Sequence, residues 1–260
     1  MQQYNRFSER IFIKQYGLPR SGTNAMKALI EINYPNVRVL TAFLGNKHDS
    51  TDWETIVSSS NSKDFEEYDL TKDDVTKIEQ LIKAVELPII IHIKKPIPWF
   101  ESYFRYQKKK IQWNNPSANL SFDIDWCRKC ARLWEEKVLS WLNLANQHPV
   151  NCIIVEHMEI LVNPENVLNA IVSKFGLNIS GNLISSIENV MKRGHYKEHG
   201  NDLINPYYKF DPSYHTENKW LDNYSPEVLS FAKQEVLKIV ERHEIISKCS
   251  IDFIDSDPEA

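Results

Sequence analysis

The chain has little of what marks a membrane-inserted or secreted protein. Among its 260 residues no apolar run approaches the length of about 20 residues that crosses a bilayer, and residues 1–10 are polar without a signal-type core. The formal net charge of −4 gives no general attraction to nucleic acid or to an anionic membrane surface. We therefore expect no stable membrane insertion and no nucleic-acid partner.

Cysteine is also scarce, and its four copies do not form a metal-binding pattern. Cys127 and Cys130 make a lone C-x-x-C inside a helical pattern, and no second pair lies at zinc spacing. We therefore expect no metal site. Small thiols on the inner face of a helix are typical of a reducing compartment, which indicates a cytoplasmic protein.

Runs typical of strands alternate with runs typical of helices. This order predicts an α/β fold with a central parallel sheet flanked by helices, and ligands bound beyond the carboxyl ends of the strands. Because no repeat or linker divides the chain, we expect a single domain over 1–260 with a core from about 10 to 245. The polar stretches 45–69 and 195–224 predict long loops. The expected strands are 11–16, 36–42, 88–93 and 151–155, and the expected helices are 23–33, 71–86, 97–110, 121–147, 164–175, 183–193 and 226–247.

Glycine is rare too, yet two of the seven glycines bracket one octet, Gly-Leu-Pro-Arg-Ser-Gly-Thr-Asn at 17–24. The octet joins the first expected strand to the first expected helix, an arrangement that cradles phosphate with backbone N–H groups. Its glycines have the spacing of a P-loop, so we predict a fold of the P-loop nucleotide-binding type. Thr23 replaces the usual lysine, Asn24 replaces the magnesium-binding hydroxyl, and the basic residue is Arg20, inside the loop.

This octet resembles the 5′-phosphosulfate loop of sulfotransferases, in which a basic residue and Ser-Gly-Thr hold 3′-phosphoadenosine-5′-phosphosulfate (PAPS). Arg20 stands where the family usually has a catalytic lysine. The resemblance implies that it stabilises the departing bridging oxygen, and since arginine keeps its proton this role is electrostatic. The resemblance implies a PAPS-binding set made of Pro19, Arg20, Ser21, Gly22, Thr23 and Asn24.

A second segment, residues 88–106, resembles the family's 3′-phosphate site. The family has a basic residue at the end of a strand, a proline two residues later and a serine eight residues after the basic one. Lys94, Pro96 and Ser102 have this spacing. Lysine replaces the usual arginine and lacks its bidentate fork, so the clamp is looser or Lys95 shares it.

The rest of the resemblance is looser and reaches from about residue 10 to about residue 240. After the strand at 151–155, Glu156 and His157 replace the family's arginine-tyrosine pair. The R-K-G triplet that the family uses on the 3′-phosphate is missing, and the aligned residues are 213–215. We expect a nearby cation to supply this contact, with Arg193 assigned to it and Lys192 and Lys197 as alternatives.

The general base is expected after the second strand. Lys47 and His48 resemble the lysine and histidine that follow this strand in cytosolic sulfotransferases, where the histidine deprotonates the acceptor. The resemblance implies catalytic roles for both, and a solvent-exposed loop histidine is the alternative. Glu101 and Asp49 remain open as rival bases, because some sulfotransferases use a carboxylate. We interpret His92, inside an expected buried strand, as a core histidine with satisfied hydrogen bonds.

The function implied by the resemblance is transfer of a sulfuryl group from PAPS to a hydroxyl or amine, in line and with a general base. The nucleotide product is 3′-phosphoadenosine-5′-phosphate (PAP), and no metal is required. The acceptor is a small molecule, such as a small metabolite, or a carbohydrate such as a glycan. Aromatic side chains that would stack on such an acceptor, or equally lie in the core or at the rim, are Trp53, Trp99, Trp113 and Tyr208.

Two other functions stay open. A P-loop kinase needs the Walker lysine and a magnesium ligand, and the octet has neither. A non-catalytic bisphosphoadenosine-binding module would keep the loop without the chemistry. The basic and aromatic run 103–110 would allow nucleic-acid contact, but a helix with a solvated cationic face is the simpler interpretation.

Overall fold

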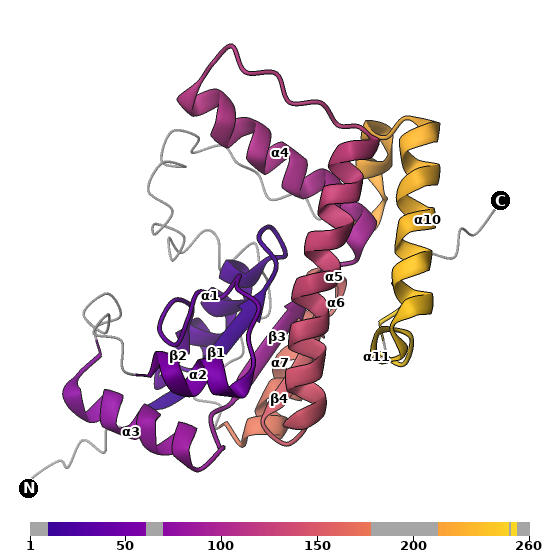
Figure 1. Ribbon diagram of the computed structural model, residues 1–260. Helices are drawn as coiled ribbons and strands as arrows, with labels where there is room; N and C mark the ends of the chain where they lie inside the picture. The colour runs from indigo at the N-terminus through magenta and orange to yellow at the C-terminus, as the bar shows by residue number, and fades with distance from the viewer. Residues whose placement is uncertain (1–9, 61–69, 178–212, 250, 254–260) are drawn as a thin grey trace, which may run out of the picture.

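Four parallel strands form the centre of the protein. The computed structural model describes residues 10–60, 70–177, 213–249 and 251–253 (Figure 1). The sheet order is β2-β1-β3-β4, and every neighbouring pair is parallel. This confirms the predicted α/β fold, and each strand lies within two residues of its expected bounds. The strands are β1 (Ile11–Gly17), β2 (Val37–Leu40), β3 (Ile89–Ile93) and β4 (Cys152–Glu156).

Helices cover the sheet on both faces. On one face, Phe12 and Ile91 share a hydrophobic core with the longer helices, and Figure 1 shows α5 running beside α10. On the other face, Ile13 and Ile90 pack against three shorter helices. The first group comprises α3 (Lys72–Lys83), α4 (Pro96–Asn114), α5 (Ile124–Gln147) and α10 (Pro226–Arg242), and the second comprises α1 (Thr23–Asn33), α6 (His157–Val162) and α7 (Pro164–Phe175).

The register of the strands brings three loops to one edge. Gly17 at the end of β1 pairs with His92 in β3, which in turn pairs with Val155 in β4. All five residues of β3 are buried, as expected of a strand covered on both faces. The segments that follow β1, β3 and β4 therefore begin side by side, and they carry most of the predicted site residues.

Short helices account for the differences from the prediction. The expected loop 45–69 contains α2 (Trp53–Ser59), whose cap is the Asp52 side chain accepting from the Thr55 N–H at 2.7 Å. The expected last helix breaks at His243, which separates α10 from α11 (Glu244–Ser247). Two further short elements are α9 (Ser213–Thr216) and the 3-10 helix η3 (Lys219–Asn223). The expected helix 183–193 lies outside the described residues.

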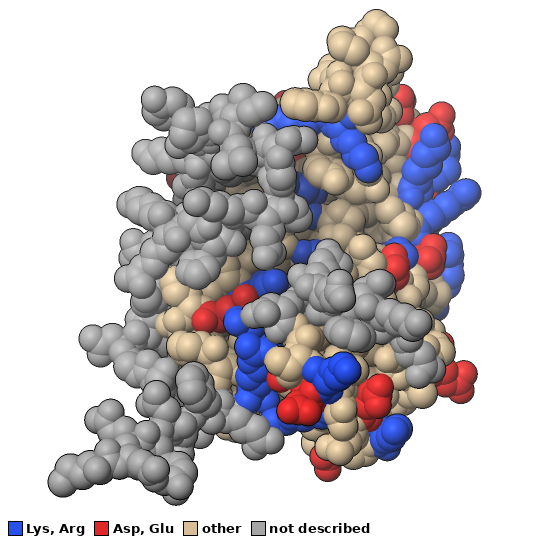
Figure 2. All heavy atoms as spheres, turned by 90° about the vertical axis from the view of Figure 1, so that its left-hand side faces the viewer, with Lys and Arg blue, Asp and Glu red and all other residues tan. Residues whose placement is uncertain are grey.

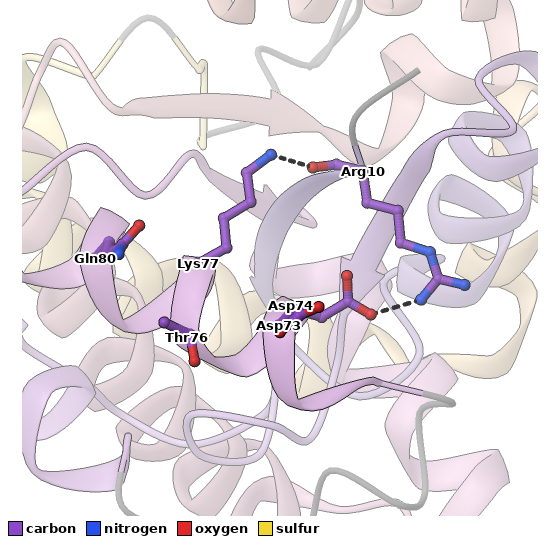
Figure 3. A pocket seen from close by; sticks show the side chains of 6 residues that line it. All are labelled: Arg10, Asp73, Asp74, Thr76, Lys77 and Gln80. Carbon is purple, nitrogen blue, oxygen red and sulfur yellow. Dashed lines mark hydrogen bonds and ion pairs between the residues drawn. The ribbon is translucent and has the colours of Figure 1, made fainter. Parts of the chain in front are cut away.

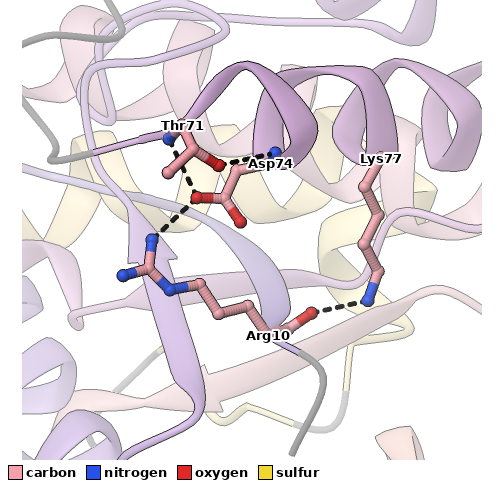
Figure 4. A network of polar contacts seen from close by, with 4 residues as sticks. All are labelled: Arg10, Thr71, Asp74 and Lys77. Atoms are coloured by element: carbon pink, nitrogen blue, oxygen red, sulfur yellow. Dashed lines mark hydrogen bonds and ion pairs between the residues drawn. The ribbon is translucent and has the colours of Figure 1, made fainter. Parts of the chain in front are cut away.

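A polar tie joins α3 to the start of β1. Thr71 and Asp74 form a reciprocal capping box, and Arg10 contacts the Asp74 carboxylate at 2.7 Å (Figure 4). The Lys77 ammonium donates to the Arg10 carbonyl at 2.7 Å. Arg10, Asp74 and Lys77 help to line a surface pocket at the amino end of β1, the end opposite the 17–24 loop (Figure 3). The tie fastens the helix to the sheet and lies away from the predicted site.

Replacing Asp74 by alanine is expected to lower the free energy of unfolding by about 1–2 kcal/mol, because the bond from the Thr71 N–H to the Asp74 carboxylate and the contact with Arg10 are both lost. Burial raises the pKa of Asp74, but the Thr71 hydrogen bonds and the Arg10 charge outweigh it and hold that pKa below the ordinary aspartate value. The stabilisation is therefore complete at neutral pH and disappears as acid protonates the carboxylate. Urea unfolding at neutral and acidic pH measures both effects. Exposed Asp73, changed to alanine, is the control and should cost much less.

Candidate functional site

The 17–24 loop leaves a helix N-terminus open to a ligand. β1 ends at Gly17, α1 begins at Thr23, and the N-cap residue between them is Gly22, which has no side chain to cap the first turn. Ser21 closes the loop, since its N–H and hydroxyl both donate to the Leu18 carbonyl, at 3.2 and 2.7 Å. No side chain caps the first turn of α1, and a helix N-terminus of this kind is suited to binding an anion.

Both glycines of the loop are needed for its geometry. A Cβ on Gly17 would lie 2.7 Å from the His92 carbonyl oxygen and from the Thr23 methyl carbon. Gly22 has φ of +83°, and a Cβ there would lie 3.0 Å from the His157 ring. The loop is therefore packed directly against the end of β3 and the start of α6.

Hydrogen bonds from α4 and from β1 fix the backbone of the loop at Pro19 and Thr23. The Pro19 carbonyl accepts from the Trp99 indole N–H at 2.6 Å, and the Thr23 carbonyl accepts from the Gln15 amide at 3.0 Å. Arg20 is exposed, with a φ of +65° and its guanidinium 5.7 Å from the centre of the Tyr106 ring. Its charge is thus presented at the surface of a loop that is itself fixed.

Lys47 and His48 lie against this loop. The Gly17 N–H donates to the Lys47 carbonyl at 2.8 Å, and the Lys47 ammonium donates to the Asn24 side chain. Nδ1 of His48 lies 2.6 Å from the Gly17 carbonyl oxygen. A carbonyl only accepts, so Nδ1 carries the proton and Nε2 of the neutral ring keeps a lone pair. The histidine is therefore oriented as a proton acceptor beside the loop.

Lys14 belongs to the same region and was missed from sequence. Its buried ammonium donates to the Phe43 carbonyl at 2.8 Å and to the Gly45 carbonyl at 2.6 Å, while the Tyr16 hydroxyl donates to the carbonyl of Leu44 between them at 3.2 Å. Burial lowers the pKa of Lys14 to about 7. A lysine in an apolar strand was the available signal, because such a side chain must find buried acceptors.

Lys14→Met is expected to loosen the turn that leads to Lys47 and His48. Loss of the charged donor should increase the local opening of residues 43–48 by about 10- to 100-fold, because the carbonyls lose their partner. Hydrogen-exchange mass spectrometry of this segment measures the opening. Lys83→Met, at an exposed site on α3, is the control. Unchanged exchange would show that the turn holds its shape without Lys14.

Lys94 directly follows β3 and Ser102 lies in α4, and both side chains are buried. Within the described part of the chain, the Lys94 ammonium has no hydrogen-bond partner. Burial is the main cause that lowers its pKa to about 7, and the charges of Arg20 and Arg105 lower it further while Glu101 opposes them. A buried cation without a partner, next to two further cations, has the surroundings of an anion site.

The two rival bases differ in their surroundings. Glu101 is 1% exposed, lies 2.6 Å from the Arg105 guanidinium and accepts from the Asn223 amide at 3.1 Å. An acid held in this way is poorly placed to take a proton from an acceptor. Asp49 is exposed, and its carbonyl accepts from the Trp141 indole at 3.0 Å.

His92 corrects one prediction. It is fully buried, as expected, but neither ring nitrogen has a hydrogen-bond partner among the described residues, so its hydrogen bonds are not satisfied. Its ring lies 5.8 Å from that of His157, which lies 5.1 Å from that of His215. Sequence reasoning missed this grouping because its members are far apart along the chain.

The aromatic residues predicted to contact the acceptor differ in their exposure, and some of the predicted aromatic and cationic residues lie outside the described ranges. Trp99 is a core residue, Trp113 is 66% exposed, and Trp53 is half-buried against His148. The residues that lie outside the described ranges are Arg193, Lys192, Lys197 and Tyr208.

Cysteine and histidine form no metal site in the part of the chain that is described. Cys127 and Cys130 are buried free thiols on the inner face of α5, and burial raises the pKa of Cys127 to about 12. No group of three or more His, Cys, Asp or Glu residues is arranged to hold a metal ion among the described residues. Within the same ranges, no helix combines the length and apolarity needed to cross a membrane.

The chain shares its fold with sulfotransferases of known structure. It resembles mouse sulfotransferase SULT7A1 complexed with PAP, with 15% identity, a TM-score of 0.54 and coverage of 91% of this chain and 87% of that one. It also matches the sulfotransferase domain of the curacin biosynthetic pathway (14% identity, 90% and 97% coverage, TM-score 0.44) and that of the Synechococcus PCC 7002 olefin synthase (12%, 90% and 98%, 0.47). No protein-family model and no curated protein matches the chain. At these identities the likeness confirms the predicted fold alone.

Proposed function

We propose that this chain, which has the sulfotransferase fold, transfers a sulfuryl group from PAPS to a hydroxyl or amine of a small-molecule or glycan acceptor. One observation carries the proposal: the open loop at 17–24 lies in contact with the base-oriented His48. The Lys94 ammonium, which has no hydrogen-bond partner within the described ranges, supports it with a second cationic position near Arg20. The mouse sulfotransferase of this fold is complexed with PAP, which favours the same nucleotide here.

The residues present fit a nucleotide with an anion at each end. The uncapped first turn of α1, with Thr23 and Asn24, would hold the 5′-phosphosulfate, and Arg20 would neutralise charge on the bridging oxygen. Lys94 and Ser102 would hold the 3′-phosphate. When bound, PAPS supplies a sulfuryl group on a phosphate leaving group.

His48 and Lys47 have separate tasks in this proposal. Nε2 of His48 accepts the proton of the acceptor hydroxyl, while Nδ1–H stays on the Gly17 carbonyl and fixes the ring. Lys47, held on Asn24, adds positive charge where negative charge develops. Magnesium has no role, because the loop lacks the Walker lysine and the metal-binding hydroxyl. We also propose that residues 1–260 fold as one domain and act in the cytoplasm, where thiols stay reduced.

The test compares donors and metals. Calorimetry should show PAP binding in EDTA, and mass spectrometry should show a sulfated product from PAPS with a panel of phenols, amines and glycans. ATP with Mg²⁺ should give no phosphorylated product, and if it does, the kinase alternative is right. PAP binding without transfer to any acceptor would favour the binding module, and no PAP binding would overturn the proposal.

A further inference from the structure

Unpartnered buried polar atoms gather in one place in this protein. Among the described residues nine such side-chain atoms occur, and seven of them belong to Lys94 and four residues around it. In most proteins nearly all buried polar groups are hydrogen-bonded, so a local concentration of exceptions needs an explanation. The five residues, here named the Lys94 cluster, are His92, Lys94, Glu101, His157 and His215.

The cluster is built from separate elements that meet at one edge of the sheet. His92 and Lys94 come from the end of β3, Glu101 from α4, His157 from the start of α6, and His215 from α9. The rings of His92, His157 and His215 follow one another at centroid distances of 5.8 and 5.1 Å. His157 also faces the 17–24 loop, 3.0 Å from where a Gly22 Cβ would lie.

The charges around the cluster are mostly positive. Arg20 from the loop and Arg105 from α4 act on both Lys94 and His215, and Lys47 acts on His92. Glu101 is the one carboxylate that acts on Lys94, and it is already paired with Arg105 at 2.6 Å. Tyr214 covers Arg105, whose guanidinium lies 4.4 Å from the ring centre. Figure 2 shows Lys and Arg side chains in and around a hollow on one face of the molecule.

We propose that His157 and His215, together with Lys94, bind the dianion of a phosphate monoester and take up a proton as it binds. The inference rests on the proposed function for the identity of that phosphate, the 3′-phosphate of PAP. It assigns to histidines of α6 and α9 the contact that the missing R-K-G triplet leaves open. The residues that align with the triplet include His215 itself.

The physical reason for proton uptake is that burial and nearby positive charge together favour the neutral form of both histidines. Burial, followed by the charge of Lys94, lowers the pKa of His215 to about 3 and holds that of His157 well below its ordinary value, while the Ser21 backbone opposes the shift in His157. A bound phosphate dianion stabilises the charged imidazoles in place of the lost water and offsets the charge of Lys94. It therefore opposes both causes and raises the pKa of each histidine. Neutral imidazoles then become charged donors to phosphate oxygens, and the bond is charge-assisted.

The test is calorimetry of PAP binding near pH 7 in two buffers with different ionisation enthalpies. The wild type should take up a fraction of a proton or more per PAP, and its affinity should rise as pH falls from 8 to 6. His215→Asn and His157→Asn should reduce this uptake and weaken PAP binding by about 10- to 100-fold. His215→Asn should not change the affinity for adenosine 5′-phosphate, which lacks the 3′-phosphate. His148→Asn, which alters a histidine against Trp53, is the control.

Two results would overturn the inference while leaving the proposed function intact. One is tight PAP binding with no proton uptake, and the other is uptake that both histidine variants retain, which would place the proton on Lys94 or on the phosphate. If PAP does not bind the wild type, the proposed function fails. NMR of the histidine rings titrated with inorganic phosphate then decides the anion site alone: shifts at His157 and His215 support it, and unchanged resonances exclude it. Should His157→Asn not fold, His215→Asn, altered at a half-buried site on the short α9, still tests the inference.

Discussion

His48→Ala is expected to reduce the rate of sulfuryl transfer by about 10²- to 10⁴-fold while PAP binds as before. The reason is the position of the ring, whose Nδ1 lies 2.6 Å from the Gly17 carbonyl oxygen, so that in the proposed mechanism Nε2 is the nitrogen that takes the proton. Because the imidazole makes contact with a backbone carbonyl and supplies no charge to the nucleotide, its removal should affect turnover and spare binding. Initial rates with PAPS and a responsive acceptor, beside PAP calorimetry, separate the two effects.

Two further measurements distinguish a base from a structural histidine. Imidazole added to His48→Gly should restore part of the lost rate, which a merely structural role would not allow. The acid limb of the wild-type pH profile, where Nε2 becomes protonated, should be missing from the residual activity of the variant. Asp49→Asn, isosteric and exposed, should keep most of the activity. If Asp49→Asn loses activity and His48→Ala keeps it, the base is the carboxylate.

The sequence predicted elements well where local signals repeat or end sharply. The bounds of α1 agree with the prediction because a glycine turn and an apolar period mark them, and the starts of α3 and α10 lie close to the predicted ones because Thr71 and Ser225 cap these helices. It failed at α2 and α6, which have seven and six residues and too few buried positions to show a period. The stability of a short helix depends on its cap and on packing against other elements, and this packing cannot be inferred from the local sequence.

The residues of the candidate site also divide into those that local spacing predicts and those that only the fold brings together. Arg20, Lys94 and Ser102 were predicted because each lies at a fixed spacing from a strand end or a glycine. Lys14 was missed, and His92 was wrongly expected to have its hydrogen bonds satisfied. Both outcomes depend on which carbonyls or rings the fold brings near the side chain. The histidines of the Lys94 cluster lie on three segments whose approach follows only from the sheet register and from α9.

Lys94→Met is expected to change two properties in opposite directions. The nucleotide-free protein should become more stable, because a buried ammonium without a partner among the described residues is replaced by an apolar chain of similar length. The melting temperature should rise by about 2–4 °C for each kcal/mol gained. PAP affinity should fall by about 100-fold, because the 3′-phosphate loses a charge-assisted donor. Lys83→Met, the same substitution at an exposed site on α3, is the control and should do neither.

The pH dependence of the same pair tests the cause. In the unfolded chain Lys94 keeps the ordinary lysine pKa near 10.4, whereas burial lowers it to about 7 in the folded protein. Between these values the unfolded state binds more protons, so the stability of the wild type relative to Lys94→Met should rise with pH across that window. Below about pH 7 the penalty of the buried charge is complete, and the variant should show its greatest advantage there. Saturating PAP should remove this advantage, since the bound phosphate provides the missing partner. A stability difference that stays constant from pH 6 to pH 10 would mean that Lys94 is not held as an unpaired buried cation.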